Sequence, residues 1–282
     1  MQYLYLLTVI FGVSLQTVIK KPYTQKTSGK GSYTFSLILS LTALAFFTLT
    51  SGGLDFNSGL LPYSALFALS YIFGTVFALE AISCGSLSLT ALFISYSLLL
   101  PTAYGLLFLK DSVGILFIPG FVLLIASIFL TNAKNEKVKV NFKWLLFASL
   151  ASIGNGMCSV SQKMQQVKFN GEYKNEFMIL ALAVVALFLA VYSVLKERRE
   201  MKTYARLGWK EAIFCGLANA VVNLFVMVLS DTMPASLLFP VISGGGILIT
   251  HIIARFYYKE KLSISQNVGF IIGLVSVILL NL

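Results

Sequence analysis

The stretch "PVISGGGILITH" runs from Pro240 to His251 and sets three consecutive glycines, Gly244 to Gly246, inside an otherwise apolar segment. In a helix each glycine costs roughly 1 kcal/mol relative to alanine, so something must compensate for three in a row. Small residues allow two membrane helices to pack closely. They also make room for a solute at the centre of a transporter. Both explanations presuppose a membrane protein.

The composition predicts an all-α polytopic membrane protein. Of 282 residues, 57% are hydrophobic and 11% are charged, and the mean hydropathy is +0.85, whereas a soluble domain carries about 25% charged residues. Apolar runs of roughly 20 residues recur, which is the length that spans a bilayer as a helix. We therefore interpret the net charge of +10 as basic loops and not as nucleic-acid binding. We expect a multi-pass protein of the cell (plasma or inner) membrane, without a metal site.

Ten membrane spans are predicted, and they divide into five plus five. A shift of 149 residues places Lys110-Asp111 on Lys259-Glu260, and Gly120 on Gly269. An odd number of spans per repeat gives the two repeats opposite orientations, a common design of secondary transporters. We expect one repeat over 1–132, a basic linker over 133–142 and a second repeat over 143–282. The predicted spans are 3–19, 32–50, 62–82, 86–109, 112–131, 143–163, 175–195, 209–230, 234–258 and 263–281.

The same shift places the glycine triplet on Ser95-Tyr96-Ser97, near the middle of spans nine and four. In transporters built from inverted repeats the substrate site lies at the repeat interface, near the bilayer midplane. The glycines therefore border a predicted site or serve close helix packing, and the two interpretations are compatible.

The chain resembles the ten-helix, EamA-type branch of the drug/metabolite transporter superfamily along essentially its whole length. The first half carries "FALEAISCGSLSLTALFISYSLLLPTAYGLLFLKDS" followed by "PGFVLLIASIFL", and the second carries "MPASLLFPVISGGGILITHIIARFYYKEKLS" followed by "NVGFIIGLVSVILL". In each half, a segment of small residues is followed by a long helix. An acidic residue comes next, and then a second helix that contains a glycine. The resemblance implies a carrier of small organic solutes, such as amino-acid-like metabolites or organic cations, that uses no cofactor.

Polar residues within the spans are the candidates for the substrate site, because such groups in hydrocarbon normally face the bundle interior or water. Asn155 and Ser159 share one helical face of span six, and Asn219 and Asn223 share one face of span eight. Interhelical hydrogen bonding is the alternative explanation for both pairs. The predicted substrate-binding residues are Gln16, Tyr71, Tyr96, Asn155, Ser159, Asn219, Asn223, Ser243 and Gly245.

Glu80 and His251 are candidates for ion coupling. A carboxylate partly withdrawn from water can carry a proton, and histidine titrates near neutral pH. The alternatives are an acid at the level of the lipid headgroups for Glu80 and an interfacial helix end for His251.

Two rival functions remain at this stage. An intramembrane enzyme would pair Ser243 with His251, but eight residues of one helix separate them by roughly 12 Å, and no catalytic motif is present. We therefore expect that the chain is not an enzyme. A lipid-carrier flippase of the same fold would need a groove open to lipid. The pattern Gly269 to Gly273 indicates either a homodimer contact or packing within a monomer.

Positive charge predicts the orientation. Seventeen of the 21 Lys and Arg residues fall in the odd-numbered links, and only Lys110, Lys163, Lys168 and Lys174 fall on the other side. The positive-inside rule then places both termini outside the cytoplasm, although ten-helix members of the family usually have cytoplasmic termini.

We predict that cysteines introduced in the first and seventh links resist a membrane-impermeant thiol reagent in intact cells, because both links face the cytoplasm. Labelling of both cysteines from outside would overturn the predicted orientation.

Overall fold

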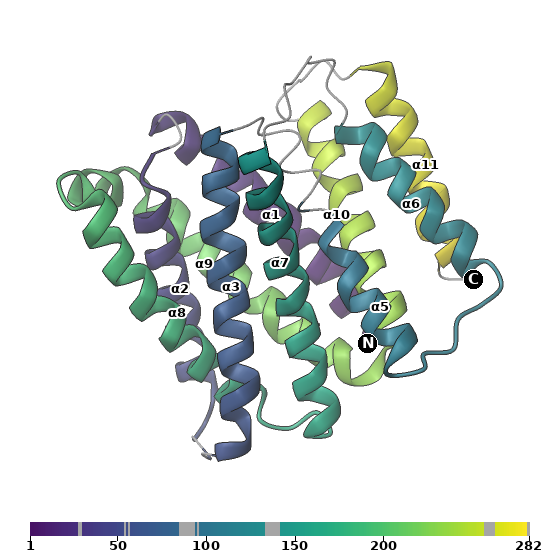
Figure 1. Cartoon of the computed structure of the whole chain (residues 1–282), viewed down its shortest axis with the longest axis horizontal. Helices are drawn as coiled ribbons and strands as arrows, with labels where there is room; N and C mark the ends of the chain where they lie inside the picture. Colours follow the sequence, from purple (N-terminus) through teal and green to yellow (C-terminus); the bar gives the residue numbers. More distant parts are fainter. Residues whose placement is uncertain are drawn as a thin grey trace. The chain divides into compact units, whose positions relative to one another are not determined.

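The computed structural model describes residues 1–27, 30–53, 55, 57–84, 94, 96–132, 142–256 and 263–280, and the regular secondary structure of this part is helical throughout (Figure 1). Two short 3-10 turns, η1 (Ser58–Leu60) and η2 (Tyr96–Leu98), accompany the α-helices. The α-helices are α1 (Gln2–Lys26), α2 (Ser32–Thr50), α3 (Leu61–Cys84), α5 (Leu99–Leu107), α6 (Phe117–Asn132), α7 (Phe142–Lys168), α8 (Lys174–Glu197), α9 (Met201–Thr232), α10 (Ala235–Phe256) and α11 (Ile264–Leu280).

Six of the described helices are long and apolar enough to cross a membrane. In α8 both faces are apolar, since Leu182 and Leu189 are buried while Leu187 and Leu195 are about 70% exposed. Its 24 residues extend about 36 Å, slightly more than the roughly 30 Å of hydrocarbon in a bilayer. A helix that is apolar all round needs lipid on its outer face. The chain is therefore an all-helical, membrane-spanning protein.

The chain forms two compact units, and each draws residues from both halves of the sequence. The first unit contains residues 1–69 and 164–231, and the second contains residues 70–163 and 232–282. Helices α1, α2, α8 and α9 lie in the first unit, and α5, α6, α10 and α11 lie in the second. Each of the longer helices α3 and α7 passes from one unit to the other.

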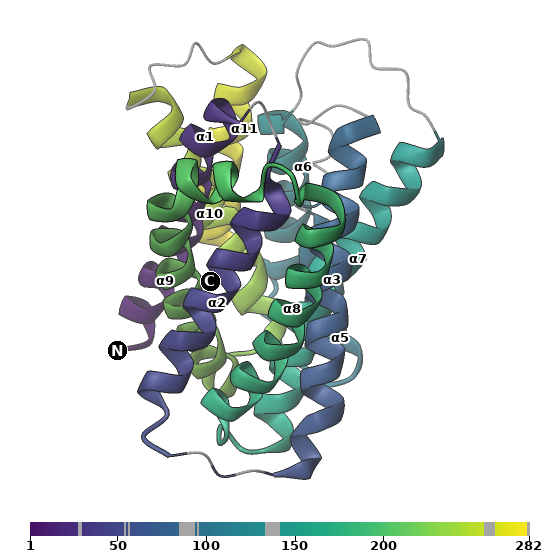
Figure 2. The same cartoon turned by 90° about the vertical axis from the view of Figure 1, so that its left-hand side faces the viewer.

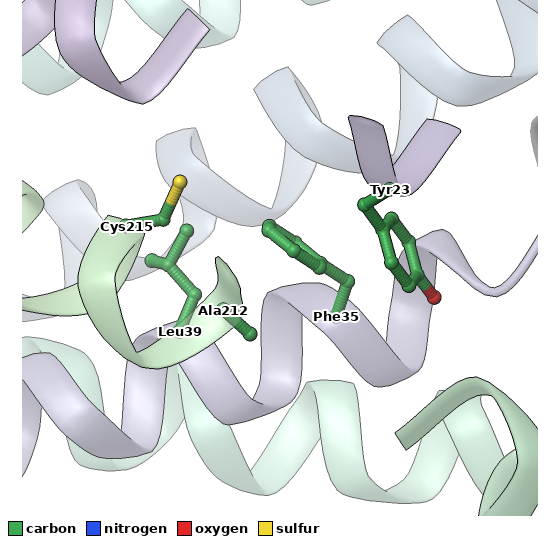
Figure 3. Packing of buried hydrophobic residues seen from close by; sticks show 5 residues of the cluster. All are labelled: Tyr23, Phe35, Leu39, Ala212 and Cys215. Carbon is green, nitrogen blue, oxygen red and sulfur yellow. The ribbon is translucent and has the colours of Figure 1, made fainter. Parts of the chain in front are cut away.

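In the first unit a buried cluster joins α1, α2 and α9 (Figure 3). It contains Tyr23, Phe35, Leu39, Ala212 and Cys215. The phenol of Tyr23 donates a hydrogen bond to the carbonyl of Gly31, at 2.7 Å. Burial raises the pKa of this phenol, and the nearby Glu197 and Tyr204 raise it further. The phenol therefore remains a donor at neutral pH.

Helices α2 and α8 lie side by side in antiparallel directions (Figures 1 and 2). The Glu197 carboxylate at the end of α8 accepts hydrogen bonds from the backbone N–H groups of Tyr33 and Thr34, at 3.1 and 2.8 Å, and from the Thr34 hydroxyl, at 2.6 Å. At the opposite end, the Asn175 amide donates to the carbonyl of Thr50, at 3.2 Å. Glu197 therefore satisfies backbone donors that the first turn of α2 leaves without helical partners.

In the second unit a carboxylate caps α10 in the same way. Asp111 Oδ2 accepts hydrogen bonds from the backbone N–H and the hydroxyl of Ser236, both at 2.9 Å. Gly105 of α5 makes this approach possible, because a Cβ atom there would lie only 2.8 Å from the Ser236 nitrogen and still closer to the Asp111 carboxylate. Helix α6 packs against α11 in this unit (Figure 1).

Several helices begin or end at other residues than the predicted spans. The link after span one was expected to begin at Lys20, but α1 continues to Lys26 because its last turns dock on α9. The link 196–208 is mostly helical, since α9 begins at Met201. The described part of span four ends at Leu107 and not at 109, because the chain turns through a left-handed Lys110 (φ 56°). This turn carries Asp111 to the start of α10, so the acid caps another helix and does not close its own.

We predict that Glu197→Gln lowers the melting temperature of the purified protein. Hydrogen bonds to a charged group contribute about 1.5–3 kcal/mol each, and the neutral amide retains a single oxygen acceptor. The measurement is thermal unfolding in detergent, with Arg198→Gln as a matched control, because Arg198 is an exposed neighbour. Equal melting temperatures for both variants would contradict the capping role of Glu197.

Candidate functional site

Helices α1 and α9 of the first unit form an antiparallel seam. Tyr5 stacks on Phe225 with ring centroids 4.7 Å apart, and Tyr23 packs on Gly208 towards the other end. The Lys26 ammonium and the Glu211 carboxylate form an ion pair at 2.7 Å near that same end. Three of the polar residues predicted from the sequence lie between these contacts.

Three carboxamides form a hydrogen-bonded row along this seam, which we call the amide row: Gln16, Asn219 and Asn223. Asn219 Nδ2 donates to Gln16 Oε1 at 3.2 Å, and Asn223 Nδ2 donates to Asn219 Oδ1 at 3.0 Å and to its carbonyl at 2.8 Å. Gln16 is buried, whereas the two asparagines are half-buried. The row therefore runs from a buried amide on α1 to two partly exposed amides on α9.

Cys215 extends the amide row by one turn and was missed as a neighbour of the site. Its thiol lies 3.6 Å from the carbonyl oxygen of Gln16, and it is buried. The signal was present in the sequence, because Cys215, Asn219 and Asn223 are spaced four apart and so share one face of α9.

In the second unit α7 packs closely on α3 beside the predicted residue Asn155. A Cβ atom on Gly154 would collide with the backbone nitrogen of Gly74 and lie 2.7 Å from the carbonyl oxygen of Ser70. Asn155 Nδ2 donates to the carbonyl of Ala151 at 2.9 Å and packs on Gly74. The Asn155 amide thus has a partner within its own helix, and the glycines let α3 approach α7.

The glycine triplet lies inside α10, which continues as a regular helix through all three residues. A Cβ atom on Gly244 would lie 2.9 Å from side-chain carbons of both Leu124 on α6 and Val277 on α11. At Gly244 the absence of a side chain therefore serves packing between helices. Gly245 is buried.

The remaining predicted residues are distributed over the second unit. Tyr71 and Glu80 on α3, Tyr96 at the start of η2, Ser159 on α7 and Ser243 on α10 are all half-buried. Glu80 lies inside α3 and does not end it, because the helix continues to Cys84. The side chain of His251 lies outside the described part of the chain.

Two further placements differ from the sequence interpretation. Lys163 was counted among the link residues but is buried in α7, where its ammonium donates to the carbonyl of Met233 at 2.8 Å. The Gly269–Gly273 pattern packs within the chain, because the Ser127 hydroxyl of α6 donates to the carbonyl of Gly269 at 2.7 Å. Among the described residues, no three His, Cys, Asp or Glu side chains gather as metal ligands would.

Comparison with known proteins supports the fold. No protein-family model matches the chain, and no curated protein matches it. Solved structures do match it, and 28 of their chains are similar. One, described as "Crystal structure of protein", matches with a TM-score of 0.78 over 99% of this chain and 95% of its own, at 12% sequence identity. At that identity the likeness shows a shared fold.

We predict that Gly154→Ala lowers the melting temperature more than Gly244→Ala does. The added methyl group at Gly154 meets backbone atoms that cannot move aside, and overpacking of this kind costs about 1–3 kcal/mol. At Gly244 it meets the ends of side chains, and alanine favours the helix by up to roughly 1 kcal/mol. Thermal unfolding of both variants is the measurement, and a larger loss for Gly244→Ala would contradict this ranking.

Proposed function

We propose that this chain is a secondary transporter of the drug/metabolite type, with ten membrane-crossing helices in two inverted repeats. It moves a small organic solute across the membrane by alternating access. Six long and four shorter apolar helical stretches support the count of ten. The four shorter stretches fall in the predicted fourth and fifth helices of each repeat.

The pairing of helices supports the inverted repeat. A two-fold axis between inverted repeats brings corresponding helices together in opposite directions. Helices α2 and α8, α5 and α10, and α6 and α11 occupy corresponding places in the two halves, and each pair is in contact. The α2–α8 pair is antiparallel, because Glu197 at the end of α8 contacts the start of α2, and Asn175 at the start of α8 contacts Thr50 at the end of α2. The α6–α11 pair is antiparallel as well, because Gly120 lies against Leu279 while the Leu130 carbonyl accepts a hydrogen bond from Ser265.

The amide row is the observation on which the transport proposal rests. Asn219 lies about 27 Å from one end of α9 and about 20 Å from the other, so it is deep in the span. Polar side chains at this depth are costly and mark solute pathways in membrane proteins. The half-buried Asn219 and Asn223 present hydrogen-bonding groups at such a depth, as a polar solute requires.

We predict that a solute which stabilises the protein in a thermal-shift screen of metabolites also crosses the membrane of proteoliposomes that contain it. Asn219→Ala should reduce that flux about tenfold or more, because a lost hydrogen bond to a buried polar group costs about 1–3 kcal/mol. The measurement is uptake of the labelled solute found in the screen.

Asn175→Ala is the matched control, because it removes a carboxamide of the same size from the start of α8, in the same unit but outside the amide row. Equal flux in the two variants would mean that the amide row does not contribute to transport. A screen in which no solute either stabilises the protein or enters the vesicles would contradict the transporter proposal itself.

A further inference from the structure

Helix α9 is longer than the hydrocarbon of a bilayer requires. Its 32 residues extend about 48 Å, against roughly 30 Å of hydrocarbon. Residues 212–230 carry no charge, and they extend about 28 Å, which matches that thickness. Residues 201–211 precede this stretch and extend about 16 Å beyond it. The first turns of α9 therefore pass through the region of the lipid headgroups.

These first turns have one buried face and one basic face. Three residues spaced four apart are buried against the rest of the first unit: Tyr204, Gly208 and Ala212. Three exposed cations with the same spacing form a line that we call the basic stripe: Lys202, Arg206 and Lys210. The two sets are offset by two residues, which is a rotation of about 200° around the helix. The basic stripe therefore lies opposite the buried face.

Aromatic side chains mark the depth at which the basic stripe ends. The next position along the same line is Phe214, which is 63% exposed. Trp209 is 50% exposed, and the Lys210 ammonium lies 5.5 Å from the centroid of its ring. Tryptophan is enriched where a membrane helix passes from hydrocarbon to the headgroups. The exposed face of α9 thus changes from basic to apolar at the boundary of the hydrocarbon.

The acids of the same stretch turn towards other groups of the protein. Residues 196–211 contain six basic and three acidic residues. Glu197 accepts hydrogen bonds from the start of α2, Glu200 accepts one from the phenol of the buried Tyr204, and Glu211 is paired with an ammonium of α1. Within the part of the chain that the structure describes, the cations of the basic stripe form no ion pair. Their face therefore keeps its positive charge.

We propose that the basic stripe binds the headgroups of anionic phospholipids in the leaflet at this end of α9. Ammonium and guanidinium groups form charge-assisted hydrogen bonds to phosphate, and each such cation near the membrane surface adds to the attraction of anionic lipid. The exposed Phe214 continues the line into the hydrocarbon, where the acyl chains of the same lipid lie. This continuity selects a lipid over a soluble phosphate. The inference depends on the membrane-spanning fold and not on the proposed transport.

Trp209 can report on the lipids beside the basic stripe. The chain has two tryptophans, so Trp144→Phe leaves Trp209 as the single fluorophore. This variant is reconstituted in mixtures of phosphatidylcholine and phosphatidylglycerol, one of which carries brominated acyl chains, and quenching gives the relative binding constant of the two lipids. We expect phosphatidylglycerol to bind about threefold more tightly or better. Raising the salt from about 0.1 to about 1 M should weaken this preference, because the screening length falls to about 3 Å.

Three double variants show whether the charges of the basic stripe cause the preference. Lys202→Gln with Arg206→Gln should remove most of it. Lys202→Arg with Arg206→Lys should keep it, because both charges remain. Lys110→Gln with Lys168→Gln is the matched control, since it removes two charges from exposed positions outside α9, and it should leave the preference unchanged.

A second measurement is independent of the tryptophan substitution. If Trp144→Phe lowers the melting temperature, native mass spectrometry of the chain with both tryptophans, and of the same double variants, gives the ratio of bound phosphatidylglycerol to bound phosphatidylcholine. Equal binding of the two lipids by the parent chain would overturn the inference, as would an equal loss of preference in the glutamine variant of the stripe and in its control.

Inorganic phosphate distinguishes a lipid from a soluble anion. Added at an ionic strength matched with chloride, it should leave the quenching by brominated phosphatidylglycerol unchanged. If it displaces that lipid, the basic stripe binds soluble phosphate and the choice of a lipid is wrong. Because none of these measurements needs a solute or a flux, their failure is separate from failure of the transport proposal.

Discussion

A helix in hydrocarbon has no water to satisfy its polar groups, and the other features of this structure follow from that constraint. Interior backbone groups are paired within each helix, so the exceptions are helix ends and polar side chains. In the first unit the Glu197 carboxylate satisfies the start of α2, and in the second unit Asp111 satisfies the start of α10. In both cases the acid comes from outside the helix that it caps, so the contact also holds two segments of the chain together.

Close packing between helices depends on glycine at a few defined points. Hydrocarbon offers little hydrophobic gain when two apolar helices meet, so close approach and hydrogen bonds must hold them. Gly154 lies against the backbone of Gly74, and Gly105 leaves room for Asp111 and Ser236. Gly244 fits between side chains of α6 and α11. Gly244, from the glycine triplet of α10, is therefore one of several glycines that allow close helix contacts within the second unit.

The amide row differs in kind from these contacts. Hydrogen bonding between helices requires only one polar pair, yet the row adds a third amide, Asn223, one turn beyond Asn219, and both asparagines are only half-buried. A row of three amides at this depth in the helix pair is the physical basis of the proposed transport.

The sequence alone predicted the helical class and the membrane, because both depend on composition and on the length of apolar runs. It also predicted that Asn219 and Asn223 share a face, since a spacing of four depends only on helix geometry. Tertiary structure decided which face of each helix meets another. It paired Gln16 with Asn219 across about 200 residues, buried Lys163 in α7, and placed Asn155 and Gly244 against neighbouring helices. Helix periodicity places side chains around one axis only, and contacts between helices depend on how separate axes come together.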